Sequence, residues 1–60
     1  MQLIAIYPMK KYKYFYAIDK QKEVCGTVKA NDIDEAFLIA SITKHLNLEE
    51  FKKIFNIEKM

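Results

Sequence analysis

The chain has 60 residues, of which 52% are apolar and 30% are charged, and its formal net charge is +2. This apolar fraction excludes a disordered chain, and the single glycine and single proline exclude collagen and flexible linkers. The basic residues are ten lysines and no arginine, so the protein lacks the side chain that most often reads DNA sequence by bidentate contacts. We expect a single small domain over residues 1–60.

Three strands are expected in the first half of the chain. A short apolar run at residues 3–7 stops at Pro8, which cannot donate a ladder hydrogen bond, and this predicts a strand at a sheet edge. Aromatic residues recur at every second position in residues 12–19, which predicts a second strand. A polar turn at residues 19–22 then leads to a third strand at residues 23–30.

The alternation leaves open which face of this sheet is buried. We favour an arrangement in which Lys13 and Phe15 lie on the open face, while the inward face consists of Tyr14, Tyr16, Ile18, Val24, Val28 and Ala30. In the alternative arrangement, Phe15 and Ala17 point inward and the tyrosines face solvent. Gly26 lies inside the third strand, and this position predicts either a bulge or the close approach of an aromatic ring.

Two helices are expected in the second half of the chain. Asn31 or Asp32, each followed three residues later by an acidic residue, resembles a capping box and predicts a helix over residues 33–45. Asn47 can end this helix and cap a shorter one that runs from Leu48 to about Phe55. The expected fold is therefore α+β, with a small three-stranded antiparallel sheet, one long helix packed on it and a short C-terminal helix, in the order βββαα.

The long helix is apolar on two nearly opposite sides. One side has small and aromatic residues suited to packing on the sheet, namely Ile33, Ala36, Phe37 and Ala40. The other side consists of Leu38, Ile39, Ile42 and Leu46, and the short C-terminal helix covers it only in part. An apolar remainder of this kind marks a partner surface. We therefore predict self-association as a homodimer through Leu38, Ile42 and Leu46.

A second candidate surface combines lysines with aromatic residues, at Lys10, Lys11, Tyr12, Lys13 and Phe15. Residues 1–30 have six lysines and two acidic residues, a net charge of +4, whereas residues 31–60 have four lysines and six acidic residues, a net charge of −2. Lysines interleaved with aromatic residues on a sheet suit either an acidic protein surface or single-stranded nucleic acid. The structural alternative is an ordinary strand with aromatic core residues and solubilising lysines.

No residue set predicts catalysis, a cofactor or a metal site. Asp34, Ser41 and His45 lie within about 40° on the helix wheel, but Asp34 and Ser41 are about 10 Å apart along the axis, so we interpret them as a solvated stripe. The lone Cys25 excludes a disulfide within the chain and is interpreted as a half-buried small residue. One histidine and one cysteine cannot fill a tetrahedral metal site.

The expected function is that of a small non-enzymatic, homodimeric, protein-binding module. Its size and its residues with AT-rich codons are typical of phage or mobile-element proteins that inhibit or adapt a host or regulatory protein. The alternative is a sheet-based nucleic-acid-binding protein that uses the Lys/aromatic surface. No apolar run approaches the roughly 18 residues of a membrane span, and the apolar run at residues 3–7 is too short for a signal peptide. We therefore expect a cytoplasmic protein without membrane contact.

Overall fold

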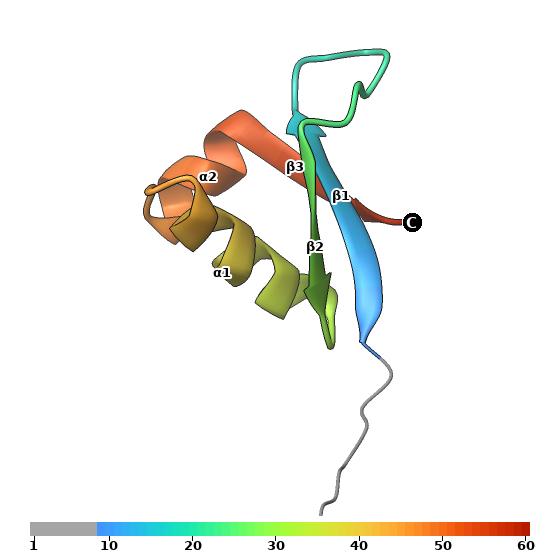
Figure 1. The fold of residues 1–60 in the computed structure, drawn as a ribbon. Coiled ribbons are helices and arrows are strands. Elements are labelled where there is room, and N and C mark those ends of the chain that lie inside the picture. Colours follow the sequence, from blue (N-terminus) through green and yellow to red (C-terminus); the bar gives the residue numbers. More distant parts are fainter. Residues whose placement is uncertain (1–8) are drawn as a thin grey trace, which may run out of the picture.

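The computed structural model describes residues 9–60, so the strand expected at residues 3–7 lies outside the described part. The described residues form three strands and two helices, which confirms an α+β architecture. In chain order the elements are β1 (Lys10–Tyr16), β2 (Gly26–Ala30), α1 (Ile33–Thr43), α2 (Leu48–Ile54) and β3 (Phe55–Lys59) (Figure 1).

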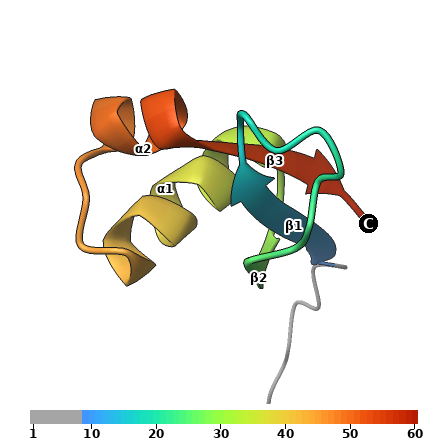
Figure 2. The same ribbon diagram turned by 90° about the horizontal axis from the view of Figure 1, so that it is seen from above.

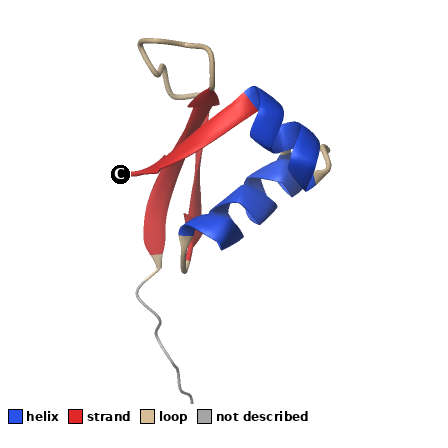
Figure 3. Cartoon of the chain, turned by 180° about the vertical axis from the view of Figure 1, so that it is seen from behind, coloured by secondary structure: helices blue, strands red, loops and turns tan. Residues whose placement is uncertain are grey.

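The strands form one antiparallel sheet in the order β2-β1-β3, with β1 in the centre. Because β2 and β3 both run antiparallel to β1, they run parallel to each other, and α1 and α2 make the crossover between them. Both helices lie on one face of the sheet, and the opposite face carries no helix of the described chain (Figures 1 and 3). Neither helix within residues 9–60 is long and apolar enough to cross a membrane.

The third strand of the described sheet comes from the C-terminus, so the order over residues 9–60 is ββααβ and the predicted order βββαα is wrong there. In β3, Phe55 and Ile57 are buried while Asn56 and Glu58 point to the other face, which is the period-two pattern of a strand. The apolar residues of α2 are followed without a break by Phe55. The sequence prediction therefore included Phe55 in the helix and missed the change from helical spacing to the alternation of a strand.

β1 ends earlier and β2 begins later than predicted, at Tyr16 and Gly26. A loop over residues 17–25 replaces the expected tight turn. Ile18 is 91% exposed in this loop, and Val24 is also exposed before β2 begins, so neither contributes to the core as predicted. Tyr16 points to the helical side as predicted, where its ring stacks on Phe55 at 4.9 Å between centroids, but it is half exposed.

The core fills the space between the sheet and the two helices, and aromatic rings dominate it. The ring of Phe51 lies at its centre, stacked on Phe55 at 4.8 Å and edge-on to Tyr14 at 5.9 Å and Phe37 at 6.0 Å. Ala36 and Ala40 let α1 approach β2 closely, because their side chains add little volume. The buried core consists of Tyr12, Tyr14, Ala30, Ala36, Ala40, Phe51, Phe55 and Ile57.

Gly26 is the place where an aromatic ring approaches the sheet backbone, which is one of the two alternatives that the sequence left open. It pairs with Tyr14 across the strands, and a Cβ atom at position 26 would lie 2.3 Å from the Tyr14 hydroxyl oxygen and 2.5 Å from Cζ. The Tyr14 ring cannot move away freely, because it also packs against Phe51 and Phe55. Glycine at this position therefore makes room for the central aromatic residue of β1.

Short polar contacts fix the start of each helix. The side chain of Asp32 accepts the backbone N–H of Glu35 at 2.8 Å, and the Glu35 carboxylate in turn accepts the N–H of Asn31 at 2.8 Å. Asn47 accepts the N–H of Glu50 in the same way at the start of α2. Both caps agree with the sequence prediction and satisfy N–H groups that have no partner within the helix.

A left-handed residue ends α1 two positions earlier than predicted. His45 has φ = 59°, its N–H donates to the carbonyl of Ile42, and the N–H of Leu46 donates to the carbonyl of Ser41. These two bonds make a Schellman motif, which reverses the chain after Thr43. The reversal turns Leu46 back toward the core, against which it packs.

Candidate interaction surfaces

The structure divides the predicted Lys/aromatic set between the two faces of the sheet. Lys11, Lys13 and Phe15 share the open face of β1, whereas Tyr12 lies in the core between sheet and helices with 4% exposure. Lys10 pairs with Ala30 and is exposed on the helical side of the sheet end. The five residues therefore do not form one surface.

The open face is a row of charged pairs that follows from the strand register. Lys11 lies directly opposite Lys29 of β2, and both are exposed. Lys13 lies between Thr27 of β2 and Glu58 of β3. Like charges directly opposite each other destabilise a sheet, so the Lys11–Lys29 pair lowers the stability of the pairing between β1 and β2.

Phe15 is 2% exposed although it lies on the face without helices. The 17–25 loop folds toward this face, on the side of the sheet away from the helices (Figure 2). Within the loop, Lys22 places its Nζ 5.9 Å from the centre of the Phe15 ring. On the other side Phe15 pairs with Asn56 of β3. Phe15 is consequently buried under the loop and offers no exposed ring for stacking.

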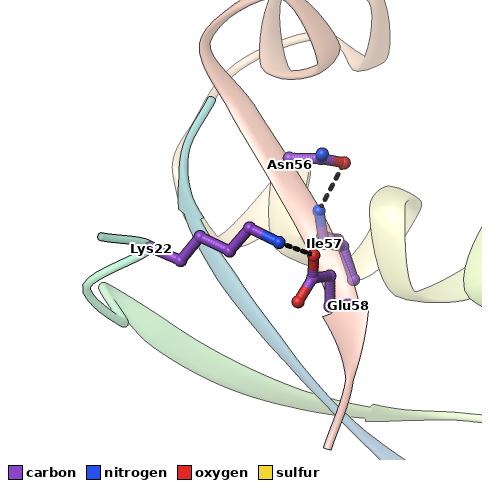
Figure 4. A network of polar contacts seen from close by, with 4 residues as sticks. All are labelled: Lys22, Asn56, Ile57 and Glu58. Carbon is purple, nitrogen blue, oxygen red and sulfur yellow. Dashed lines mark hydrogen bonds and ion pairs between the residues drawn. The ribbon is translucent and has the colours of Figure 1, made fainter. Parts of the chain in front are cut away.

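An ion pair ties this loop to β3. The Lys22 ammonium donates to the Glu58 carboxylate at 2.7 Å, while Asn56 accepts the N–H of Ile57 beside it (Figure 4). The hydrogen bond from Lys22 has the largest effect on Glu58 and lowers its pKa, desolvation opposes this, and the charges of Lys22 and Lys13 each lower the pKa to a lesser extent. Glu58 therefore stays ionised and partly neutralises two of the lysines.

The 17–25 loop is ordered by Asp19. Its carboxylate accepts the N–H groups of Gln21 and Glu23 at 2.9 and 3.1 Å, and its carbonyl accepts the N–H of Lys22. Lys22 itself has φ = 54°, a left-handed conformation that the turn imposes. These contacts hold the Lys22 side chain over the sheet.

The outer side of α1 is the second candidate surface, and the structure leaves two of its three predicted residues uncovered. Leu38 is 49% exposed and Ile42 is 65% exposed, one turn apart on the side of α1 away from the sheet. Leu46, the third predicted residue, is partly buried against the core. α2 covers Phe37 on the flank of α1, and Phe37 contacts Phe51 edge-on, but α2 does not cover Leu38 and Ile42.

Two polar residues singled out in the sequence have other roles than predicted. Ser41 is 2% exposed, and its hydroxyl donates to the carbonyl of Leu38 at 2.7 Å, so it does not belong to a solvated stripe with Asp34 and His45. Cys25 is exposed rather than half-buried. Residues 9–60 contain no group of three or more histidine, cysteine or acidic side chains placed to hold a metal ion, and no pocket was found on them.

Sequence reasoning missed three residues of the open face, Lys22, Lys29 and Glu58. The alternation in β2 already placed Lys29 and Val28 on different faces of the sheet. The residue that lies across from Lys29 depends on the register between β1 and β2, which the alternation does not give. Glu58 belongs to a strand that was not predicted, and Lys22 reaches it only because the loop folds over the sheet.

Comparisons with known proteins give no relative for this chain. No protein-family model, no curated protein and no solved structure matches it.

Proposed function

We propose that the protein is a non-enzymatic binding module that acts through the outer side of α1 and that it associates with a second copy of itself there. The observation that carries the proposal is the exposure of Leu38 and Ile42, 49% and 65%, on a helix whose other side buries Ala36, Ala40 and Ser41. Exposed leucine and isoleucine one turn apart form a continuous apolar stripe, and such stripes are typical of helix-to-helix contacts.

The charges along α1 favour an antiparallel pair of helices. Its first turn contains Asp34 and Glu35, and His45 and Lys44 follow its last turn. A two-fold axis beside residue 40 would place Leu38 of each copy against Ile42 of the other and bring Glu35 near His45 of the second copy. Such a contact is self-complementary, as a closed dimer requires.

An interface of ordinary size would take up a large share of this small molecule. A stable dimer buries about 800 Å² on each partner. The accessible surface of the chain is 4548 Å², so this would be about a sixth of it. Leu38 and Ile42 would form the centre, and the polar ends of α1 would form the rim. We expect association that depends on protein concentration.

Sedimentation velocity or light scattering over a range of concentrations tests the proposal. The wild-type protein should approach twice the 7.1 kDa monomer mass at high micromolar concentration. The double variant Leu38→Gln with Ile42→Gln should remain monomeric at the same concentration, because glutamine is polar and favours the helix. Ile18→Gln makes the same kind of change at a residue that is 91% exposed in the loop, and it should dimerise like wild type.

Three results would overturn the proposal: a monomeric wild-type protein at high micromolar concentration, a Leu38→Gln and Ile42→Gln double variant that still dimerises, or equal loss of dimer in the Ile18→Gln control. The orientation has its own test in a Cys25→Ser background. A mixture of Leu38→Cys and Ile42→Cys proteins should form the mixed disulfide faster than either variant links to itself, because only the mixed pair lies face to face. Preferential self-linking would contradict the antiparallel arrangement.

A further inference from the structure

We infer that the open face of the sheet is a binding surface for the phosphate backbone of double-stranded nucleic acid. The surface consists of Lys11, Lys13 and Lys29 on the strands and Lys22 from the loop. This surface is separate from the outer side of α1 and does not depend on self-association.

The first argument is an excess of positive charge that the fold leaves uncompensated. Three strand lysines, Lys11, Lys13 and Lys29, share this face with one strand carboxylate, Glu58, which lies opposite Lys13 and pairs with Lys22 of the loop. The loop that supplies Lys22 adds no net charge, because residues 17–25 have two lysines and two acidic residues. Lys11 and Lys29, at the other end of the face, lie opposite each other. The face and its loop therefore have a net charge of +2, and the exposed pair Lys11 and Lys29 repels itself. A polyanion that lies between these two side chains removes the repulsion.

The second argument concerns the kind of polyanion. Lysine is depleted in protein–protein interfaces, where buried aromatic or arginine anchors supply the affinity, but it binds phosphate well as a point charge. Tyr12 and Phe15 are buried and the half-exposed Tyr16 lies on the helical side, so β1 presents no ring on the open face on which an unpaired base could stack. The face suits phosphates that are presented regularly and without unstacked bases, as in a duplex.

The third argument is the separation of charge between the two layers. The acidic first turns of α1 and α2, with Asp34, Glu35, Glu49 and Glu50, belong to the helical layer. This layer also has three lysines, so residues 31–54 have a net charge of −2, from five acidic residues and three lysines. The helical layer lies on the other side of the sheet from the lysine face (Figure 2). A duplex would therefore be attracted to the open face and repelled by the helical layer, which fixes the orientation of the protein on it.

The test is a salt titration of binding to a fluorescent duplex of about 20 base pairs of arbitrary sequence. With the three strand lysines each neutralising one phosphate, log Kd should rise with log salt with a slope of about 3. The double variant Lys11→Gln with Lys29→Gln should make the slope shallower by about 2. The matched control, Lys52→Gln with Lys53→Gln, removes the same charge from the last turn of α2 and should keep the wild-type slope.

Loss of folding cannot account for a loss of binding in the test variant, because removing the Lys11–Lys29 repulsion should keep or raise its stability in urea. Absence of duplex binding at low salt would overturn the inference, as would an equal loss of slope in the α2 control. Tighter binding to the single strand, or to poly-glutamate, than to the duplex would also overturn it. Leu38→Gln with Ile42→Gln should still bind the duplex, so this result separates the inference from the proposed dimer.

Discussion

The two faces of the sheet are built in opposite ways from the same strands. On the helical face, Tyr14 is held between Phe51 and Phe55, and its ring approaches Gly26 closely. On the open face, one buried ring, Phe15, lies under a loop, and most of the remaining positions are charged. The first face stabilises the fold by removing apolar surface from water, whereas the second exposes charges at a cost in stability.

This difference shows that the alternation of a single strand can serve two purposes. The helical face needs large rings at positions 12 and 14, and the open face is left free for lysines at positions 11 and 13. A chain of 60 residues buries little apolar surface and has a small net stability, so a pair of lysines that repel each other destabilises it noticeably unless a partner neutralises their charge.

The largest effect should come from removing the centre of the helical face. Phe51→Ala deletes a fully buried ring that contacts three other aromatic residues and should cost about 3–5 kcal/mol, enough to unfold much of a domain this small. Phe15→Ala, on the open face, should cost less, because the loop above it can close the gap. Urea unfolding of both variants by circular dichroism checks the order, and a larger cost for Phe15→Ala would reverse it.

A smaller effect is expected where the helical face touches the backbone. Gly26→Ala should cost about 1–3 kcal/mol, because the new Cβ would lie 2.3 Å from the Tyr14 hydroxyl oxygen in a core that cannot relax freely. Combining it with Tyr14→Phe removes that oxygen and should recover part of the loss. Thermal melts of the single and double variants measure the recovery; strictly additive losses would mean that the contact does not limit packing.

The helical layer can also be strengthened without a change to either sheet face. His45 has φ = 59° in the Schellman turn, and glycine adopts this conformation without strain. We expect His45→Gly to stabilise the fold by about 0.4–1 kcal/mol, which is the usual gain in stability when a substitution introduces a residue that suits the backbone angles at its position. Urea unfolding should show the gain, and a loss would mean that the histidine side chain makes a contact worth more than the strain.

The smallest and most local effect concerns the loop over Phe15. Since the pKa of Glu58 is lowered in the folded protein, its contribution is complete above the ordinary value of 4.5 and is lost as pH falls through the lowered pKa. Protection of the amides of residues 17–25, measured as the exchange rate relative to the intrinsic rate at each pH, should therefore fall below that pH, and Lys22→Gln should produce the same loss of protection at neutral pH. Unchanged protection of the loop in both conditions would show that the ion pair does not hold the loop.

Much of the fold follows from neighbouring residues and could be predicted. Asp32 and Asn47 cap helices through their own side chains, and Gly26 is explained by the aromatic strand next to it. Leu38 and Ile42 were placed on the outer side of α1 by helical periodicity, and the structure leaves them exposed. Each of these inferences depends on positions close in sequence, where a period or a cap is sufficient.

The missed features depend on contacts between distant segments. Phe55 and Ile57 fit either a helix or a strand by their apolar character, and only pairing with β1 makes them a strand. The opposition of Lys11 and Lys29 depends on the β1–β2 register, which a nine-residue loop sets in place of the expected short turn. Leu46 was predicted on the outer side because the Schellman turn that returns it to the core was not recognised.

We infer that the open face carries positive charge at the expense of stability, and the urea unfolding midpoint of Lys29→Glu at low salt measures this cost. The variant replaces the repulsion opposite Lys11 with an attraction, so the free energy of unfolding should rise by up to about 1 kcal/mol, and the gain should shrink in high salt. An unchanged or lower midpoint at low salt would show that the lysine pair does not destabilise the sheet.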